Sequence, residues 1–132
     1  MKRLLLTVTF LAACASGSAA AADQPETVMI TLRCKPGSEA ALMEVLTRHY
    51  DTAVKLEMVK EGAPHVTLRA TDTEAKPSFI EILTWRDASA PDSVPAAIQS
   101  LWQEMHKLVE SRGGRPGLAI DEVTLVTRGS QP

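Results

Sequence analysis

The order of two hydrophobic periodicities along residues 27–127 constrains the fold of this chain more than any other feature. In four short segments apolar and polar residues alternate, which is the pattern of half-buried strands. In two longer segments apolar residues recur every three or four positions, which predicts amphipathic helices. The predicted strands are residues 27–34, 65–71, 78–86 and 118–127; the first predicted helix covers residues 38–59, and the second runs from Pro95 to Gly113.

The resulting order is strand, helix, strand, strand, helix, strand. This order defines the split βαβ, or ferredoxin-like, α+β fold, in which both helices cover one face of a four-stranded antiparallel sheet. In the usual strand order of this fold, the first and third strands are neighbours at the centre. We therefore expect one domain over residues 27–128 and a short tail at residues 129–132.

The N-terminus has the three parts of a bacterial export signal. Lys2 and Arg3 form a positive start, residues 4–13 form an apolar stretch, and small residues follow up to Ala22. This pattern predicts a signal peptide over residues 1–22, a flexible lead-in at residues 23–26 and a periplasmic or secreted protein. The apolar stretch is too short to span a bilayer as a mature helix.

Two routes of processing fit this segment. Leu11-Ala12-Ala13-Cys14 resembles a lipobox, in which case Cys14 would be lipidated and would anchor the protein to a membrane. Ala20-Ala21-Ala22 resembles an ordinary signal peptidase site. On either route Cys34 is left without an intramolecular disulfide partner. Its place in an alternating strand favours a packing role over a reactive thiol.

Charge and composition argue against nucleic acid as a partner. The net charge is −2, and no run of Lys and Arg follows the N-terminus, so no basic surface is predicted. The two Phe, two Trp and one Tyr are too few for a platform that stacks single-stranded bases. The chain lacks CxxC and HExxH motifs and its three His are scattered, so neither a metal site nor a cofactor is predicted.

The predicted sheet has two faces, and two helices can cover only one of them. We place the aliphatic sets of the strands under the helices: Val28/Ile30/Leu32, Val66/Leu68/Ala70, Ile80/Ile82 and Val123/Leu125. The opposite face then carries Phe79, Leu83 and Trp85 beside several charged residues. A monomer rarely exposes such a patch, so we expect a homodimer in which two sheets close over each other as a barrel.

Charged and polar side chains on that opposite face form the candidate site. We expect Arg33 to lie near Glu81 and Glu122, because buried charges need partners. His65 and Arg69 join them from an edge strand, and apolar walls with convergent polar groups also describe a ligand cavity. The predicted catalytic residues are His65 or Glu81 as proton acceptor and Arg33 or Arg69 as oxyanion holder. The predicted substrate-binding residues are Phe79, Trp85, Thr31, Thr67 and Glu122.

Two stretches of the sequence carry a resemblance to a known family. They are Val28-Met29-Ile30-Thr31-Leu32-Arg33-Cys34-Lys35-Pro36-Gly37-Ser38 and Phe79-Ile80-Glu81-Ile82-Leu83-Thr84-Trp85-Arg86-Asp87. Over residues 27–127 the chain resembles the dimeric α/β-barrel superfamily and, within it, the antibiotic biosynthesis monooxygenase (ABM) domains. The resemblance implies a homodimer, small apolar ligands in the cleft between sheet and helices, and cofactor-independent oxidation of an electron-rich aromatic substrate.

The chain departs from the related haem-degrading enzymes, which rely on an Asn, a Trp and a His. It contains no Asn, and the four-residue spacing of Trp102 and His106 does not match their wider spacing, so haem binding is not expected. Trp102 and His49 continue the apolar stripes of the two helices and also fit the core. Because fold alone does not establish a reaction, two functions stay open: an exported cofactor-free monooxygenase, or a non-enzymatic dimer that binds a small molecule or serves structurally.

Overall fold

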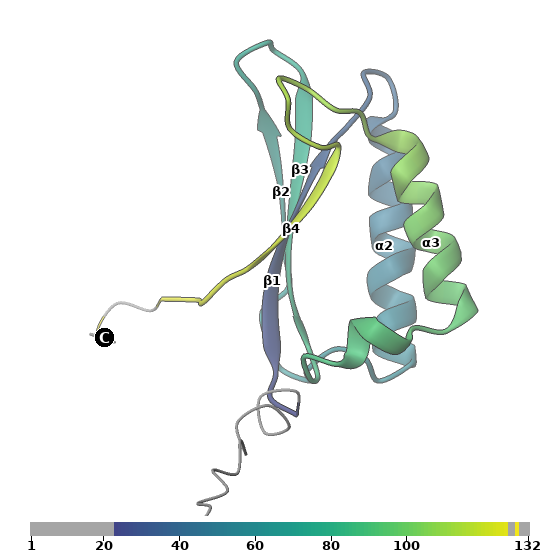
Figure 1. Ribbon diagram of the computed structural model, residues 1–132, viewed down its shortest axis with the longest axis vertical. Coiled ribbons are helices and arrows are strands. Elements are labelled where there is room, and N and C mark those ends of the chain that lie inside the picture. The colour runs from purple at the N-terminus through teal and green to yellow at the C-terminus, as the bar shows by residue number, and fades with distance from the viewer. Residues whose placement is uncertain (1–22, 127–128, 130–132) are drawn as a thin grey trace, which may run out of the picture.

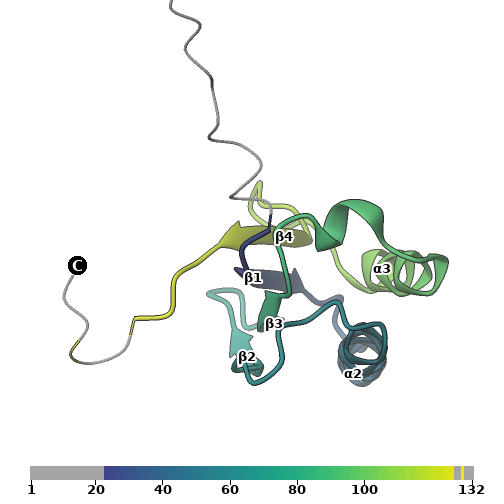
Figure 2. The ribbon, with the colours of Figure 1, turned by 90° about the horizontal axis from the view of Figure 1, so that it is seen from below.

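The computed structural model describes residues 23–126 and residue 129. The predicted signal peptide with Cys14, and most of the predicted tail, lie outside these residues. A single antiparallel sheet is covered on one face by two helices (Figures 1 and 2). The elements are β1 (Glu26–Arg33), α2 (Glu39–Lys55), β2 (Val66–Thr71), β3 (Pro77–Trp85), a short 3₁₀ helix (Ala90–Ser93), α3 (Ala96–Leu108) and β4 (Leu118–Glu122).

The strand order in the sheet is β2-β3-β1-β4. It places β1 and β3 at the centre and β2 and β4 at the edges, as the ferredoxin-like prediction requires. The hairpin of β2 and β3 and the pairing of β1 with both β3 and β4 are antiparallel. The predicted fold class and the order of the elements are therefore confirmed.

Both helices end earlier than the sequence pattern predicts. After α2, Glu57 takes a positive φ of 55° and the N–H of Met58 donates to the carbonyl of Ala53 at 2.9 Å, which closes the helix. After α3, Val109 is extended (φ −115°, ψ 158°) and pairs with Cys34. Because Val109 pairs with the end of β1, α3 does not continue into the further turn that the sequence predicts up to Gly113.

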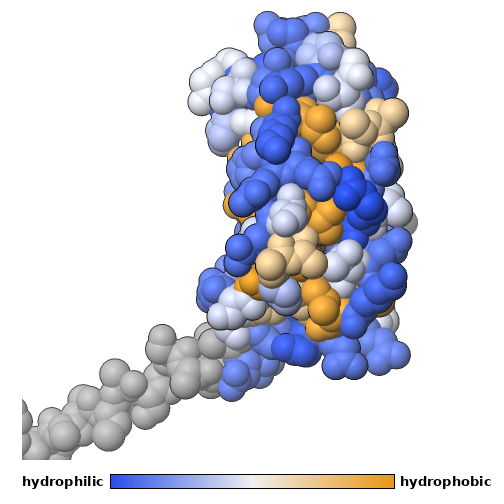
Figure 3. All heavy atoms as spheres, turned by 90° about the vertical axis from the view of Figure 1, so that its right-hand side faces the viewer, coloured by the Kyte–Doolittle hydropathy of each residue, from blue (hydrophilic) through white to orange (hydrophobic). Residues whose placement is uncertain are grey.

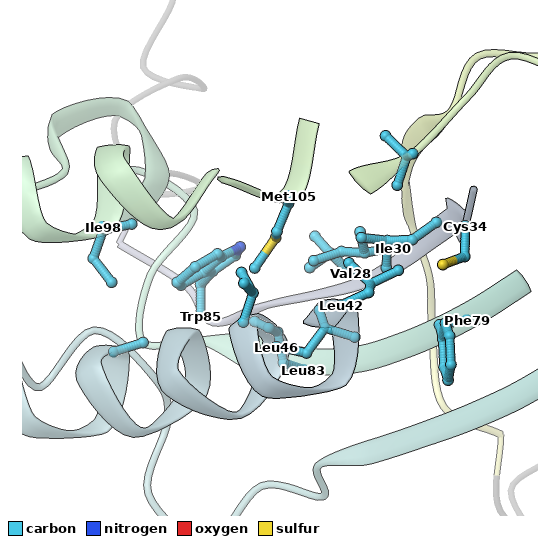
Figure 4. Close-up of a cluster of buried hydrophobic side chains, with 14 of the residues drawn as sticks. Val28, Ile30, Cys34, Leu42, Leu46, Phe79, Leu83, Trp85, Ile98 and Met105 are labelled. Carbon is cyan, nitrogen blue, oxygen red and sulfur yellow. The ribbon is translucent and has the colours of Figure 1, made fainter. Parts of the chain in front are cut away.

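The core lies between the helices and the inner face of the sheet (Figure 4). Leu42 and Leu46 of α2 and Ile98 and Met105 of α3 are buried there, as the apolar stripes of both helices predict. Burial of a side chain of this size stabilises a fold by about 1.5–3 kcal/mol. Cys34 is also buried and free, and burial is the main cause that raises the pKa of its thiol.

The predicted assignment of sheet faces is correct for β1 and wrong for the other strands. Directly paired residues point to the same face. Val28 and Ile30 of β1 are buried under the helices, and they pair with Leu83 and Glu81 of β3. Phe79, Glu81, Leu83 and Trp85 therefore lie on the helix-covered face, and the three apolar ones belong to the buried core (Figure 4). Ile120 and Glu122 pair with Ile30 and Val28 and share this face, although both are exposed.

The open face of the sheet is consequently aliphatic. It carries Val66, Leu68, Ile80 and Ile82, with Met29 beside them in register. Leu68 is 49% exposed and Val66 38% exposed. The expected contact of Arg33 with Glu81 and Glu122 does not form, because Glu81 lies on the other face and Arg33 pairs with Ser78. The Arg33 guanidinium donates instead to the carbonyl of Pro116 at 2.5 Å.

The outer surface of the helix layer differs from the open sheet face. Figure 3 shows this side as largely hydrophilic, with apolar patches between the polar side chains. In the described part of the chain, no helix is long and apolar enough to cross a membrane.

Candidate functional site

The site begins with Glu81, a carboxylate placed in the middle of a hydrophobic core. Glu81 lies on the helix-covered face of β3, a central strand that pairs with β1 and β2, and its side chain is 0% exposed. Its Oε1 lies 2.8 Å from Nε2 of His65, whose side chain is 26% exposed. A buried carboxylate is costly without a partner, so the His65 imidazole is the group that makes this position tolerable.

A second histidine faces the other carboxylate oxygen. His49 on α2 is 1% exposed, and its Nδ1 lies 4.0 Å from Glu81 Oε2. Its Nε2 accepts a hydrogen bond from the indole Nε1–H of Trp102 on α3 at 3.0 Å. Since an indole can only donate, the Nε2 of a neutral His49 must be the acceptor and its Nδ1 must carry the proton. The Nδ1–H therefore points at Glu81 Oε2 across a gap in which neither atom has a hydrogen-bond partner.

Burial sets the protonation of this cluster. Desolvation, together with the charge of His65, lowers the pKa of His49 from 6.5 to about 4. Desolvation raises the pKa of the Glu81 carboxyl, while the hydrogen bond and charge of His65 act in the opposite direction. Both shifts disfavour charge in the core, so near neutral pH His49 is an uncharged proton acceptor beside a carboxyl group.

Tyr50 holds His65 in place. The two rings are stacked, with centroids 3.5 Å apart and planes at 5° to each other. Tyr50 follows His49 on α2, so adjacent residues of one helix contact the core side and the edge side of the same cluster. His65, in the loop before β2, therefore contacts Glu81 with its ring plane fixed by the stacking on Tyr50.

A pocket of about 190 Å³ opens beside His49, on the side away from Glu81's partner His65. It lies between α3, the 3₁₀ helix and strands β1 and β4. Its walls are mainly apolar and include both tryptophans of the chain. The lining residues are Glu26, Val28, Ile30, His49, Trp85, Pro91, Trp102, Met105, His106, Leu118 and Ile120. An apolar cavity with a few polar groups is the usual form of a small-molecule site.

The structure brings together some of the residues that the sequence predicts as a site. His65 and Glu81 are in contact, and Trp85 lines the pocket next to them. Arg69, Phe79 and Thr67 lie apart from the pocket, along an open groove between α2 and β2. The remaining predicted residues do not join either group: Thr31 is on the open face, Arg33 is at the end of β1 and Glu122 is exposed at the end of β4.

Three residues of the cluster were not among the predicted site residues. His49 and Trp102 fit the apolar stripes of their helices, and the sequence gives no sign that they bond to each other across 53 positions. Tyr50 lies next to His49 and carries no motif. The only available signal was the type of residue: a His inside an apolar stripe needs a polar partner once it is buried.

The described residues contain no group of three or more His, Cys, Asp and Glu side chains arranged to hold a metal ion. Haem, which the related enzymes bind, does not fit the pocket found here. About 190 Å³ is below the roughly 300–1,000 Å³ of sites for drug-sized ligands, and haem is larger still.

Solved structures with the same architecture come from several bacteria. A candidate ABM from Caulobacter crescentus superposes with a TM-score of 0.58 at 11% identity, over 82% of this chain and 95% of that one. A candidate ABM from Bacteroides thetaiotaomicron gives a TM-score of 0.57 at 13% identity, over 84% and 98%. A dimeric ferredoxin-like protein of unknown function from a Jannaschia species gives 0.54 at 15% identity, over 76% and 99%.

These likenesses establish the fold. The chain has the ferredoxin-like fold of the ABM-like proteins over most of its length, as the resemblance in its sequence predicts. No family model and no curated protein matches the sequence.

Proposed function

We propose that this protein binds a small hydroxyaromatic molecule in the pocket beside His49 and oxidises it with dioxygen, without a cofactor. The observation that carries the proposal is a neutral, proton-accepting imidazole in the wall of a largely apolar pocket. Solved structures of the same fold include proteins named as antibiotic biosynthesis monooxygenases and a possible oxidoreductase, which supports oxidation as the reaction class.

The size of the pocket limits the substrate. A dry protein cavity of about 150 Å³ accommodates benzene, so about 190 Å³ corresponds to a molecule of one or two rings. Trp85 and Trp102 provide flat walls for such rings. Glu26 and His106 are the other polar residues of the lining.

Deprotonation is the step that the site can assist. A substrate hydroxyl that displaces the Trp102 indole from His49 Nε2 would give its proton to that nitrogen, and the resulting phenolate-like ring is a better reductant for dioxygen. One oxygen atom then enters the substrate at a CH₂ or ring carbon as a carbonyl. The other oxygen leaves as water with two substrate hydrogens, so the substrate supplies all four electrons.

Fluorescence and oxygen uptake together test the proposal. Both tryptophans of the chain line the pocket, so a one- or two-ring quinol should change the protein fluorescence on binding. Oxygen consumption and incorporation of one labelled oxygen atom should accompany binding. Leu118→Phe, which fills the pocket, should abolish both signals, and Leu56→Phe, at an exposed position after α2, should preserve them.

The same experiment separates an enzyme from a binding protein. Binding and thermal stabilisation without oxygen uptake would assign the pocket to non-enzymatic binding. Absence of any response across a panel of such compounds, with Leu118→Phe indistinguishable from wild type, would contradict the proposed site.

We further propose that the open sheet face forms a homodimer. This face is aliphatic, because it carries Val66, Leu68, Ile80, Ile82 and Met29. A contiguous exposed apolar surface larger than monomers usually show is typical of a protein–protein interface. A neighbour of the same fold is dimeric. Light scattering should give twice the monomer mass for wild type and the monomer mass for Leu68→Glu, while Leu56→Glu stays dimeric. A monomeric wild-type protein would contradict the proposal.

We also propose that the chain is exported, on the basis of its N-terminal pattern alone. Mass spectrometry of the protein recovered from a bacterial periplasm should find a mature chain that begins at Asp23. A lipid-modified chain that begins at Cys14 would assign membrane anchoring instead, and an intact Met1 in the cytoplasm would contradict export.

A further inference from the structure

We propose that His65 is the solvent end of a proton relay in which Glu81 connects it to His49 in the pocket wall. The relay deepens the proposed function, because it gives the proton of a buried substrate a route out of the core. It starts at the pocket between α3, β1 and β4 and ends at the opposite edge of the sheet, where His65 precedes β2.

One of the two contacts in the relay is a formed hydrogen bond, and the other is a gap too long for a hydrogen bond. Glu81 Oε1 and His65 Nε2 are 2.8 Å apart, which is a formed hydrogen bond. Glu81 Oε2 and His49 Nδ1 are 4.0 Å apart, and both atoms are buried without a partner. Two unpaired buried polar atoms that face each other are unfavourable in a purely structural cluster. A shift of about 1 Å in either side chain would complete a continuous path.

The groups around Glu81 in the described structure fit a proton path between the two histidines. The titratable groups that face Glu81 are His65, before β2, and His49, on α2. Ile30 of β1 and Thr67 of β2 flank Glu81 in the sheet. His49 itself is 1% exposed, whereas the side chain of His65 is 26% exposed and can exchange protons with water.

Proton transfer along the relay starts from the state in which His65 carries two protons and Glu81 carries none. The substrate hydroxyl gives its proton to His49 Nε2, and the proton on His49 Nδ1 moves to Glu81 Oε2. His65 keeps its Nε2–H on Glu81 Oε1 and releases the Nδ1 proton to water. One proton has then left the substrate and one has reached the solvent, and the reverse sequence returns a proton to the product.

Proton exchange measured by NMR tests the relay without any substrate. The chain contains three histidines, so the signals of His49, His65 and His106 can be assigned by replacing each one in turn. The measured quantity is the rate at which the His49 Nδ1 proton exchanges with water, obtained by saturation transfer. A positioned side chain accelerates proton transfer by about 10²–10⁴-fold. Glu81→Gln and His65→Gln should therefore each slow this exchange by at least about tenfold.

The direction of the change separates a relay from a structural role. If Glu81 and His65 served only to pack the core, their replacement would loosen the site and speed the exchange of His49. Unchanged or faster exchange in both variants would thus overturn the proposal. Glu104→Gln removes an exposed carboxylate that pairs with Arg48 on the outside of the helices, and it should leave the rate unchanged.

Failure of the relay and failure of the proposed function give different results. The exchange experiment uses the protein without ligand, so slow exchange in Glu81→Gln supports the relay even if no aromatic compound binds. Conversely, oxygen uptake by wild type together with unchanged exchange in both variants would leave the pocket chemistry intact and remove His65 from it.

Discussion

Two buried ionic clusters, one around Arg112 at the end of the sheet where β3 begins and one around Glu81 in the middle of β3, are built differently. Arg112, in the loop between α3 and β4, donates to Asp72 Oδ2 at 2.7 Å and to the carbonyls of Cys34 and Pro77 at 2.6 and 2.7 Å. Its Nε also lies 3.4 Å from a carboxylate oxygen of Glu110. Both Nη groups of this guanidinium form hydrogen bonds, whereas Nε has only the ion pair with Glu110 and no hydrogen bond; the partners come from three separate segments of the chain.

The Glu81 cluster is only partly satisfied. One oxygen of Glu81 contacts His65, while the other oxygen and the facing Nδ1 of His49 have no partner. Arg112 ties together the ends of β1, β3 and the loop after α3, which is a structural task. The unpaired atoms around Glu81 raise the energy of the folded state and leave room for a proton to move. Arg112 stabilises the fold, whereas in the proposed relay Glu81 transfers a proton at some cost in stability.

Replacing Arg112 should produce the largest loss of stability. Arg112→Met removes the guanidinium that donates to the carbonyls of Cys34 and Pro77 and to Oδ2 of Asp72. Breaking a buried ionic cluster on one side costs about 3–5 kcal/mol. Chemical denaturation should show this decrease in the free energy of unfolding. Arg48→Met, in an exposed ion pair with Glu104, serves as control and should leave the midpoint in place.

The contributions of the two clusters to the stability of the fold should also be lost in different pH ranges. His49 has a folded pKa of about 4 against 6.5 when unfolded, so the unfolded chain binds the proton first as the pH falls from 6.5 to 4. This lowers the free energy of unfolding by up to about 3 kcal/mol across that window. Asp72 has a folded pKa below its usual 3.8, chiefly through the backbone N–H of Lys76, so the stability that it contributes is lost only at lower pH.

Denaturation midpoints measured at intervals of pH check this separation. In His49→Gln, whose amide oxygen can still accept the Trp102 N–H, the decline between pH 6.5 and 4 should disappear. Glu81 acts in the opposite sense, because its raised pKa makes ionisation unfavourable to the fold as the pH rises above 4.5. Glu81→Gln should therefore steepen the His49 decline. Equal slopes in all three proteins would show that the cluster does not govern acid stability.

Replacing Glu81 by an apolar residue should raise the free energy of unfolding, whereas replacing Arg112 should lower it. Glu81→Met removes a carboxylate that is 0% exposed and keeps a similar volume in the core. Substitution of a buried ionic group by a well-packed apolar one is often neutral or stabilising by about 1–4 kcal/mol. We expect a gain of about 1 kcal/mol at pH 7, measured by denaturation, together with loss of oxygen uptake. A loss of several kcal/mol would place Glu81 with Arg112 as a structural group.

The sequence predicts the fold well and the site only in part, for reasons that particular residues show. Alternation and helical spacing are local signals, so the order of elements follows from them. The central position of β1 and β3 follows from the usual strand order of the fold that this order defines. The faces of β3 do not, because Ile80 and Ile82 on one side are as apolar as Leu83 and Phe79 on the other. A carboxylate is uncommon in a core, so the sequence predicts Glu81 on the face opposite the helices.

The cluster around Glu81 depends on contacts that no local pattern contains. His49 meets Trp102 and Glu81 only after both helices have packed on the sheet. The same holds for Arg112, whose hydrogen-bond partners are 35 to 78 positions away. Residue type alone predicts that a buried His or Arg must find partners. Which partners it finds is determined by the register of the strands and the packing of the helices.

Tyr50 offers the smallest and most selective change, because it contacts the edge of the Glu81 cluster and not its core. Its ring is stacked on His65 at 3.5 Å, and such aromatic pairs contribute about 0.5–1.5 kcal/mol. Tyr50→Leu should lower the free energy of unfolding by about 1 kcal/mol and release the His65 ring from its fixed plane. The His65 signals in NMR should then broaden or shift, whereas the hydrogen bond of Trp102 to His49 should persist. If the Trp102 indole proton shifts as much as the His65 signals do, the cluster is one rigid unit like that of Arg112, and the distinction between the two clusters fails.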